Sequence, residues 1–512
     1  MYYVQNNFIL NLTTNFITLG LTIVMSLWLT PFIIHNLGVE AFGLVNLTQT
    51  LINYLTIITV TLSSMIGRFF TIEFQRGENE RAQSYINTYF FSSIFIASIL
   101  LIILTGLAVF INKIVDVPQY LLFDVRISIL VGSLLFVVTF VSSAFSAAPF
   151  CMNKLYITNG IQAVNAITRV VIIILLLTVF SPRIWYVNIG NLLAGIVSLL
   201  LGIYYFKKLI PWMKVGYEYF DVKKLKDLFN AGIWNSIGQI GVLLFLQIDL
   251  LVANLMLGAE MAGKYSAVIQ FPLLLRTVAT TIAAVFAPII ITHYANNRMD
   301  ELKYYSNQAV RLNGLILSLP AALLCGAGGA LLRVWLGQEF EEMKWLLIIN
   351  SLYLVIALGV MPLFHIATAV NKLKLPALAT LGLGILNLVL AILLSGPAGL
   401  GLYGIAIAGA IALVAKNFIF TPIYSAYITQ QPIFIYYRGI LSPVIGTGFT
   451  ILLSMWIQSM FYINGWIMLI LHIIIVSIIY FCFVLLFLIN KRERKNIVVA
   501  IKTFVSRKSK TR

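Results

Sequence analysis

Four ionisable residues lie deep inside long apolar segments, where a charge needs a special environment. They are Arg169, Asp249, Arg276 and Lys416. A charge at the bilayer centre costs from about 3 to more than 10 kcal/mol depending on the method, so such side chains usually face a protein interior or a wet cavity. We therefore take these four as the first candidates for function. The structural alternatives are snorkelling to the membrane surface or a buried ion pair, such as Asp249 with an arginine.

Amide and hydroxyl side chains recur at helical spacing on three apolar segments. Residues three, four or seven positions apart share one face of a helix. Such faces can line a hydrated cavity for a polar ligand, or they can join membrane helices at about 0.6 kcal/mol per hydrogen bond. Taken together, the three polar faces favour a cavity lining over simple contacts between helices. Their members are Asn11, Asn15, Thr18 and Thr22; Asn46, Gln49, Asn53 and Thr56; and Asn235, Gln239, Gln247 and Asn254.

The chain that carries these residues has the composition of a polytopic membrane protein. Of its 512 residues, 61% are hydrophobic and 10% are charged, whereas about a quarter of the residues in soluble domains are charged. A spanning helix needs roughly 20 apolar residues, which predicts an all-α fold of about 14 transmembrane helices. The predicted helices are 8–33, 44–66, 86–110, 127–149, 160–180, 187–206, 229–256, 264–291, 312–333, 345–367, 376–395, 403–425, 439–461 and 466–489.

The distribution of the basic residues indicates how the chain is oriented in the membrane. The chain has 34 lysines and arginines and a formal net charge of +17. Most of them fall in alternate loops and in the tail, which the positive-inside rule assigns to the cytoplasm together with both termini. We therefore expect no nucleic-acid partner. The tail from Lys491 to Arg512 mixes basic and apolar residues, so it either lies on anionic membrane lipids or only anchors the topology.

A short motif occurs twice, 220 positions apart, as Leu37–Gly43 and Leu257–Gly263. This spacing indicates that one unit was duplicated. The repeat spans six predicted helices, an even number, so both copies enter the membrane from the same side. Parallel repeats predict two lobes related by an axis along the membrane normal, with the substrate path between them. The predicted division is a lobe at 1–206, a cytoplasmic linker at 207–228, a lobe at 229–427, and two extra helices with the basic tail at 428–512.

Several kinds of chemistry have no sequence signature here. The chain contains no GxxxxGK[ST] phosphate loop, so ATP is not the expected direct energy source. The four histidines are scattered along the chain without the spacing of a zinc site. We expect no metal and no cofactor. The predicted outer loops are short and poor in acidic clusters, so we do not expect an enzyme.

The first copy of the motif, within Leu29–Leu44, and the second, with Gln247–Leu250 before it, resemble the corresponding segments of bacterial polysaccharide (O-antigen type) flippases. These flippases belong to the multidrug, oligosaccharidyl-lipid and polysaccharide exporter (MOP) superfamily. Helix count, duplication and the extra terminal pair match as well. The resemblance implies a multi-pass protein of the bacterial plasma membrane that flips an undecaprenyl-pyrophosphate-linked oligosaccharide to the outer leaflet by alternating access, for the synthesis of surface polysaccharide such as exopolysaccharide.

The resemblance also implies roles for the charged residues. Cavities in this family tend to be cationic, which suits Arg169, Arg276 and Lys416 as ligands of the pyrophosphate. The polar residues Asn15, Asn46, Gln49, Asn53, Asn235 and Gln239 would complete the substrate site. Asp249 matches the family's acidic position in helix seven, and we expect it to couple transport to an ion. Glycosyltransferases and a polymerase of the same pathway are the possible protein partners.

Other functions remain open on sequence grounds. An ion-coupled drug or cation antiporter of the same fold is the first alternative, although that branch usually stops at twelve helices. A flippase of peptidoglycan precursors is a further possibility within the leading class. A membrane polymerase or glycosyltransferase fits less well, because such enzymes generally need larger extramembrane loops.

Overall fold

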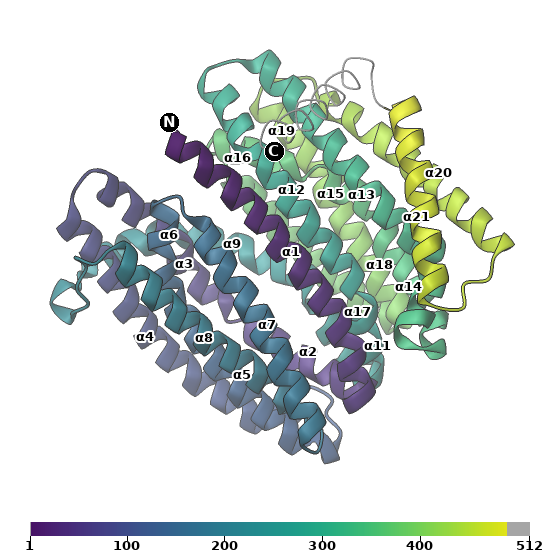
Figure 1. Cartoon of the computed structure of the whole chain (residues 1–512), viewed down its shortest axis with the longest axis horizontal. Helices are drawn as coiled ribbons and strands as arrows, with labels where there is room; N and C mark the ends of the chain where they lie inside the picture. The colour runs from purple at the N-terminus through teal and green to yellow at the C-terminus, as the bar shows by residue number, and fades with distance from the viewer. Residues whose placement is uncertain (1, 489–512) are drawn as a thin grey trace, which may run out of the picture. The chain divides into compact units, whose positions relative to one another are not determined.

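The regular structure of the described residues, 2–488, is entirely helical (Figure 1). The structure is a computed structural model, and it describes the side chains of these residues apart from 2–9, 12 and 235. Within residues 2–488, thirteen helices are long and apolar enough to cross a membrane, and the number is 14 if the two halves of one bent helix, Val222–Trp234 and Ser236–Leu246, count as one span. The predicted all-α, multi-pass fold is confirmed. The basic tail at Lys491–Arg512 lies outside the described residues.

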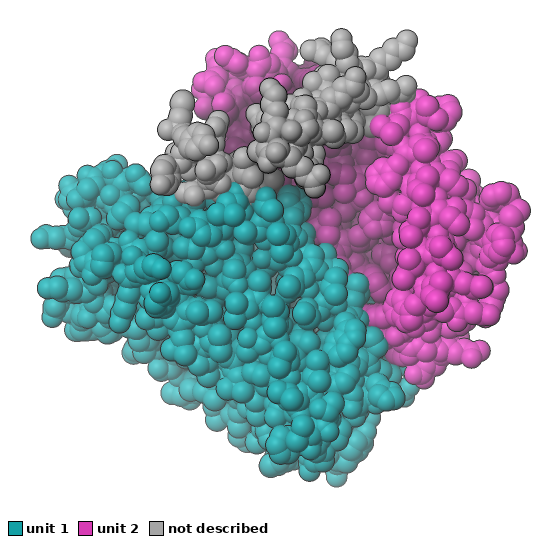
Figure 2. Space-filling view, viewed as in Figure 1, with its two compact units in different colours: residues 1–270, 373–412 teal, residues 271–372, 413–512 magenta. Residues whose placement is uncertain are grey.

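The chain divides into two compact units, which Figure 2 colours separately. Unit 1 comprises residues 1–270 and 373–412, and unit 2 comprises residues 271–372 and 413–512. This division by packing differs from the division by sequence repeat, and the six-helix lobes at 1–206 and 229–427 remain a prediction.

Unit 1 holds the first eleven α-helices, which include both copies of the repeated motif, and two later helices. Its elements are α1 (Tyr2–Leu37), α2 (Val39–Asn53), α3 (Thr56–Gln75), α4 (Asn79–Phe110), η1 (Ile111–Lys113), η2 (Gln119–Leu121), α5 (Leu122–Ser142), η3 (Ser143–Ser146), α6 (Ala147–Cys151), α7 (Leu155–Val179), α8 (Trp185–Leu209), η4 (Tyr217–Tyr219), α9 (Val222–Leu246), α10 (Ile248–Leu257), α11 (Ala259–Val268), α17 (Lys374–Ser395) and most of α18 (Gly401–Val414).

Unit 2 holds the remaining helices, including the C-terminal pair. Its elements are α12 (Gln270–Ala295), α13 (Met299–Leu336), η5 (Gln338–Met343), α14 (Lys344–Leu352), α15 (Leu354–Gly359), η6 (Met361–Leu363), α16 (Phe364–Ala369), the π-helix η7 (Ala415–Phe420), α19 (Thr421–Ile428), η8 (Ile435–Tyr437), α20 (Arg438–Met460), α21 (Trp466–Phe483) and the π-helix η9 (Val484–Leu488).

The two copies of the repeated motif have the same backbone. Gly38 precedes α2 with φ 88° and ψ 164°, and Gly258 precedes α11 with φ 91° and ψ 171°. A positive φ is strained for residues with a Cβ, which explains glycine at both places. Each glycine also closes the helix before it, because its N–H donates to the carbonyl four residues earlier, at 2.8 Å in Gly38 and 2.9 Å in Gly258. The motif is therefore a helix stop followed at once by a new helix.

The two motif copies also touch each other, within unit 1. A Cβ added to Gly43 would lie 2.6 Å from the Cα of Gly263, and one added to Gly263 would lie 2.2 Å from the carbonyl oxygen of Val39. The side chain of Asn46 donates to Ser266 Oγ at 3.2 Å. Gly43 and Gly263, like Asn46 and Ser266, are counterparts in the repeat. α2 and α11 thus pack face to face around a local two-fold relationship between the copies.

Helix α9 packs tightly on α3 and α17, which brings it into unit 1. A Cβ at Gly232 would lie 1.8 Å from the carbonyl oxygen of Thr61, and one at Gly241 would lie 2.6 Å from the carbonyl carbon of Thr380. Small residues allow membrane helices to approach this closely. These contacts explain why the helices after the predicted linker pack with the N-terminal ones.

Several of the predicted spans contain a break, and two of these breaks contact each other. Residues 44–66 run across the end of α2 and the start of α3, and residues 229–256 run across the junction of α9 and α10 at Gln247. The hydroxyl of Tyr54, at the first break, donates to the backbone carbonyl of Gln247, at the second, over 3.3 Å. Broken helices are tolerated at membrane depth where protein groups satisfy the freed backbone.

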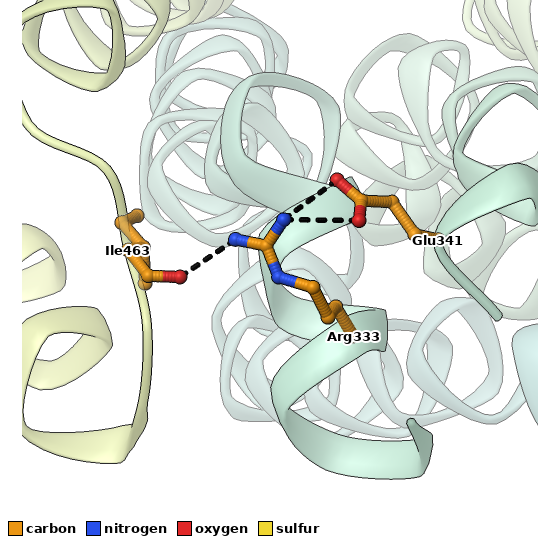
Figure 3. Close-up of polar contacts among 3 residues, drawn as sticks. All are labelled: Arg333, Glu341 and Ile463. Carbon is orange, nitrogen blue, oxygen red and sulfur yellow. Dashed lines mark hydrogen bonds and ion pairs between the residues drawn. The ribbon is translucent and has the colours of Figure 1, made fainter. Parts of the chain in front are cut away.

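The C-terminal helices of unit 2 are fixed to α13. Ser318 Oγ donates to the carbonyl of Pro443 in α20 at 2.9 Å. Arg333, at the end of α13, donates from Nη1 to both carboxylate oxygens of Glu341 at 2.9 Å and from Nη2 to the carbonyl of Ile463 at 2.6 Å (Figure 3). Its guanidinium also lies 4.4 Å from the ring centre of Tyr462. One arginine thus holds the turn between α20 and α21.

We expect Arg333→Ala to loosen this turn. Hydrogen bonds to charged groups contribute about 1.5–3 kcal/mol each, and the Ile463 carbonyl would lose its donor. The measurement is limited proteolysis of the purified protein, with faster cleavage near residues 461–465 in the variant. Glu342→Ala is the matched control, because Glu342 is exposed and lies next to Glu341 in η5. Equal cleavage rates in Arg333→Ala and the control would contradict the anchoring role.

Candidate substrate site

A cavity of about 840 Å³ lies within unit 1. Its walls come from the end of α2 and α3, from α5 with η3, and from α7 and α8. Most of the lining side chains carry a hydroxyl or an amide, whereas small-molecule pockets are usually lined mainly by apolar groups. The lining residues are Gln49, Ile52, Asn53, Thr56, Thr59, Val60, Ser63, Gly132, Leu135, Phe136, Thr139, Phe140, Ser142, Ser143, Ser146, Thr158, Gln162, Asn165, Arg169, Asn188, Asn191, Gly195 and Ser198.

Helix α7 gives the cavity one continuous polar wall. Thr158, Gln162, Asn165 and Arg169 all line it, at spacings of four, three and four residues. This spacing places them on one face of the helix, along about 16 Å of its length. Asn165 Nδ2 donates to Ser198 Oγ of α8 at 2.9 Å, so the neighbouring helix orients its amide.

The helices around the cavity approach closely at glycines. A Cβ at Gly190 of α8 would lie 2.4 Å from Ile173 of α7, and one at Gly195 would lie 2.8 Å from Leu135 of α5. Asn188, which is fully buried, closes one wall: its Nδ2 donates to Ser128 Oγ at 2.7 Å, and its Oδ1 accepts from Gln49 at 3.3 Å. The wall that carries Gln49 and Asn188 is therefore held in place by the protein.

Arg169 is the one charged residue among those that line the cavity. Its Nε is buried and has no hydrogen-bond partner among the described residues, and none of their carboxylates forms an ion pair with it. A guanidinium presents five donors in a fixed plane and binds carboxylates or phosphates in a bidentate way. The cavity therefore offers an uncompensated positive charge at one end of a neutral polar surface.

Asp249 does not line this cavity. It is buried in α10, where Oδ2 accepts from the hydroxyl of Tyr265 at 3.1 Å and Oδ1 accepts from Asn387 Nδ2 at 3.0 Å. All three residues belong to unit 1. Asn387 also donates to the carbonyl of Leu244, near the end of α9. The carboxylate thus fixes α10 to α11 and α17, and within the described part of the chain it belongs to no cluster of three or more metal-binding side chains.

The other two predicted cations belong to unit 2. Arg276 in α12 donates from Nη2 to the hydroxyl of Tyr353 at 3.1 Å. Lys416 lies in the π-helix η7, with its ammonium 5.1 Å from the ring centre of Phe364. π-Helical turns within α-helices are frequent at functional sites.

The predicted polar ligands divide into three groups. Gln49 and Asn53 line the cavity beside Arg169. Asn46 donates a hydrogen bond to Ser266 between the motif copies, Asn15 is exposed on α1, and Gln239 is partly buried on α9 outside the cavity. The side chain of Asn235 lies outside the described residues.

Comparison with known proteins identifies the relatives of the chain. The model of the family described as polysaccharide biosynthesis protein matches residues 4–293, more than half of the chain. The chain belongs to this family. The uncharacterized membrane protein EpsK of Bacillus subtilis (strain 168) is 49% identical over 488 residues, which cover 95% of this chain and 97% of that protein. A putative O-antigen transporter of Shigella flexneri is 24% identical over 356 residues, covering 68% of this chain and 81% of that protein.

Solved structures share the fold of this family member. The inward closed conformation of the lipid II flippase MurJ superposes with a TM-score of 0.66 at 17% identity, covering 92% of this chain and 99% of that one. An inward-facing multidrug resistance MATE transporter of the MOP superfamily gives a TM-score of 0.62 at 13% identity, covering 81% and 95%. The fold is thus that of MOP transporters, and the resemblance to polysaccharide flippases of that superfamily is confirmed.

Sequence reasoning missed much of the cavity of this polysaccharide biosynthesis protein. Gln162, Asn165, Asn188 and Asn191 were not among the predicted site residues, although all four line the cavity with Arg169. The signal on α7 was available, since Thr158, Gln162 and Asn165 lead at helical spacing to Arg169. On α8 a similar signal was available, since Asn188, Asn191 and Ser198 also stand at helical spacing.

Proposed function

We propose that this protein is a transporter that flips an undecaprenyl-pyrophosphate-linked oligosaccharide from the inner to the outer leaflet, by alternating access, for surface polysaccharide biosynthesis. The observation that carries the proposal is the unit 1 cavity, with its neutral hydroxyl and amide walls and the single cation Arg169. A glycan is a polyhydroxylated ligand, and its pyrophosphate link is anionic. The names of two relatives, a putative O-antigen transporter and a lipid II flippase, support the same class of cargo.

The charges in unit 2 support an anionic cargo as well. Arg276 and Lys416 are cations within two apolar segments of unit 2, and a bound anion would interact favourably with both. In this proposal Arg169 binds the pyrophosphate in one conformation of the transport cycle, and Arg276 with Lys416 contributes in another. The six-helix lobes at 1–206 and 229–427 are the proposed moving parts.

An ion-coupled antiporter of drugs or cations is the second candidate, because the MATE structures share the fold. A cationic drug needs a counter-charge or an apolar surface in its site. The residues that line the cavity include no carboxylate and are mostly polar. The cavity chemistry therefore favours the lipid-linked glycan over the cation.

Reconstitution tests the proposal. Purified protein is placed in proteoliposomes that carry fluorescent lipid-linked oligosaccharide on one leaflet, and an impermeant glycosidase reports the fraction that reaches the other leaflet. We expect flipping to exceed that in protein-free liposomes. An absence of flipping together with transport of amphiphilic cations would replace the proposal with the antiporter.

We further propose that Asp249 couples transport to a proton or sodium ion. Its carboxylate is buried and meets neutral donors, Tyr265 and Asn387. The Oδ1 of Asn387 is buried and has no hydrogen-bond partner among the described residues, so it is a further oxygen ligand in reach of the same site.

The prediction for Asp249→Asn follows from this chemistry. The variant should flip lipid-linked sugar at similar rates with and without an imposed ion gradient, whereas the parent should respond to the gradient. The control is Asp227→Asn, an exposed carboxylate near the start of α9. Loss of folded protein in Asp249→Asn would instead assign a purely structural role, and an unchanged gradient response at the parental rate would rule out coupling.

The surroundings of the transporter follow from the same proposal. It would lie in the bacterial plasma membrane with both termini in the cytoplasm, as the distribution of lysine and arginine favours. Glycosyltransferases and a polymerase of the pathway are its proposed partners, and anionic lipids are proposed to bind the basic tail.

A further inference from the structure

The unit 1 cavity contains side chains that the protein leaves unsatisfied. Gln162 on α7, which is exposed, and Asn191 on α8, which is partly buried, line it, and their amides make no hydrogen bond to any described residue. Gln49, Asn165 and Asn188, by contrast, are held by bonds within the protein. A ligand would thus meet fixed amides and free amides in one cavity. Amide side chains that face a cavity are well suited to hydrogen-bond with sugar hydroxyls, because each offers both a donor and an acceptor.

Arg169 makes one end of this polar surface positively charged. Arg169 follows Gln162 by seven residues on the same face of α7, about 10 Å along the helix. Its buried Nε lacks a partner among the described residues. The rings of Phe136 and Phe140 line another part of the cavity and provide an apolar surface. A pyranose ring that carries one anionic group matches this surface. The amides can bind its hydroxyls, the aromatic rings can contact its apolar face, and the guanidinium can bind the anion.

We infer that this cavity is a saccharide-binding subsite, in which Gln162 and Asn191 read the hydroxyls of a sugar and Arg169 binds an anionic group on that same sugar. The inference rests on the proposed function for its cargo and names the part of the cargo that this cavity recognises. The anionic group has two possible chemical sources. It is either the phosphate that joins the first sugar to the carrier or a carboxylate on an acidic sugar.

Binding of small sugars to the purified protein tests the inference. The protein is reconstituted in lipid nanodiscs, so that no glycoside detergent competes, and ligand binding is followed by saturation-transfer NMR of the sugar protons. The probes are glucose 1-phosphate, glucuronic acid and glucose, with inorganic phosphate, which has no carbon-bound proton, measured as a competitor of the bound sugar. We expect at least one of the two anionic sugars to bind more tightly than glucose and phosphate, and the tighter one identifies the source of the anion.

Variants separate the two parts of the subsite. Gln162→Ala and Asn191→Ala should each weaken binding of the anionic sugar by roughly threefold to tenfold, as expected for one neutral hydrogen bond. Arg169→Gln should bring the affinity of the anionic sugar down to that of glucose. Thr178→Ala is the control, because Thr178 is exposed on α7 and does not line the cavity.

The outcomes for this inference and for the proposed function differ. If lipid-linked oligosaccharide is flipped but the Gln162→Ala, Asn191→Ala double variant binds sugars and transports as the parent does, the subsite is wrong and the transporter stands. If the anionic sugar binds in an Arg169-dependent way but no lipid-linked glycan is flipped, the subsite stands and the transporter is wrong. Equal binding of all four probes would overturn the subsite.

Discussion

Replacing Arg169 with Gln is expected to lower polysaccharide export at least tenfold while leaving the protein in the membrane. The guanidinium is the one charge that lines the unit 1 cavity. It forms no ion pair with a described carboxylate, so the substitution leaves no buried carboxylate without its partner. Charge-assisted hydrogen bonds contribute about 1.5–3 kcal/mol, which corresponds to roughly ten- to 150-fold in binding. Because Gln has about the size of the Arg stem and can donate, folding should change little.

Surface polysaccharide in a deletion strain complemented with each variant gives the measurement, with the amount of protein in the membrane fraction as a reference. Arg169→Lys should retain part of the export, because it keeps the charge and loses the bidentate geometry. Arg68→Gln is the matched control, since Arg68 is exposed on α3 and lies outside the cavity lining. Full export by the double Arg169→Gln, Arg276→Gln variant would remove both arginines from the mechanism.

The largest effect on stability is expected for Gly232→Ala. A methyl group there would lie 1.8 Å from the carbonyl oxygen of Thr61, which is a backbone atom and cannot rotate away. Either α9 or α3 must shift, and the hydroxyls of Thr61 and Ser236, which share a short hydrogen bond beside this contact, would separate. We expect a loss of about 3 kcal/mol, the upper end of the usual cost of overpacking.

Thermal unfolding of the protein in detergent, followed by size-exclusion chromatography, measures the change. The control is Gly238→Ala in the same helix, because a methyl group at Gly238 meets nothing within 4 Å. This control should unfold at the parental temperature or slightly above it, since alanine favours the helix over glycine. A parental unfolding temperature for Gly232→Ala would show that α9 does not pack on α3 as described.

Local sequence information was enough to predict the helices. Long apolar runs predicted the spans, and the cost of a charge within such a run selected four residues, of which Arg169 lines the cavity. The breaks at Tyr54 and Gln247 could not be predicted from their neighbourhoods, because neither contains glycine or proline. They are stabilised by a bond between residues that are 193 positions apart.

Packing between distant helices was beyond the reach of the sequence pattern. The repeat predicts that α9, α10 and α11 correspond to the first helices, and it does not predict what they contact. Glycines determine what α9 contacts, since Gly232 and Gly241 let it approach α3 and α17 closely. A glycine in a membrane helix is common, so its partner is known only once the fold is known.

The contact between the two motif copies makes each copy the packing surface of the other. In a symmetric homodimer, residues on the axis meet their own copies, as Gly43 meets Gly263 and Asn46 meets Ser266 here. A Cβ on either glycine would meet the backbone of the other copy, so a substitution at one position displaces both copies at once.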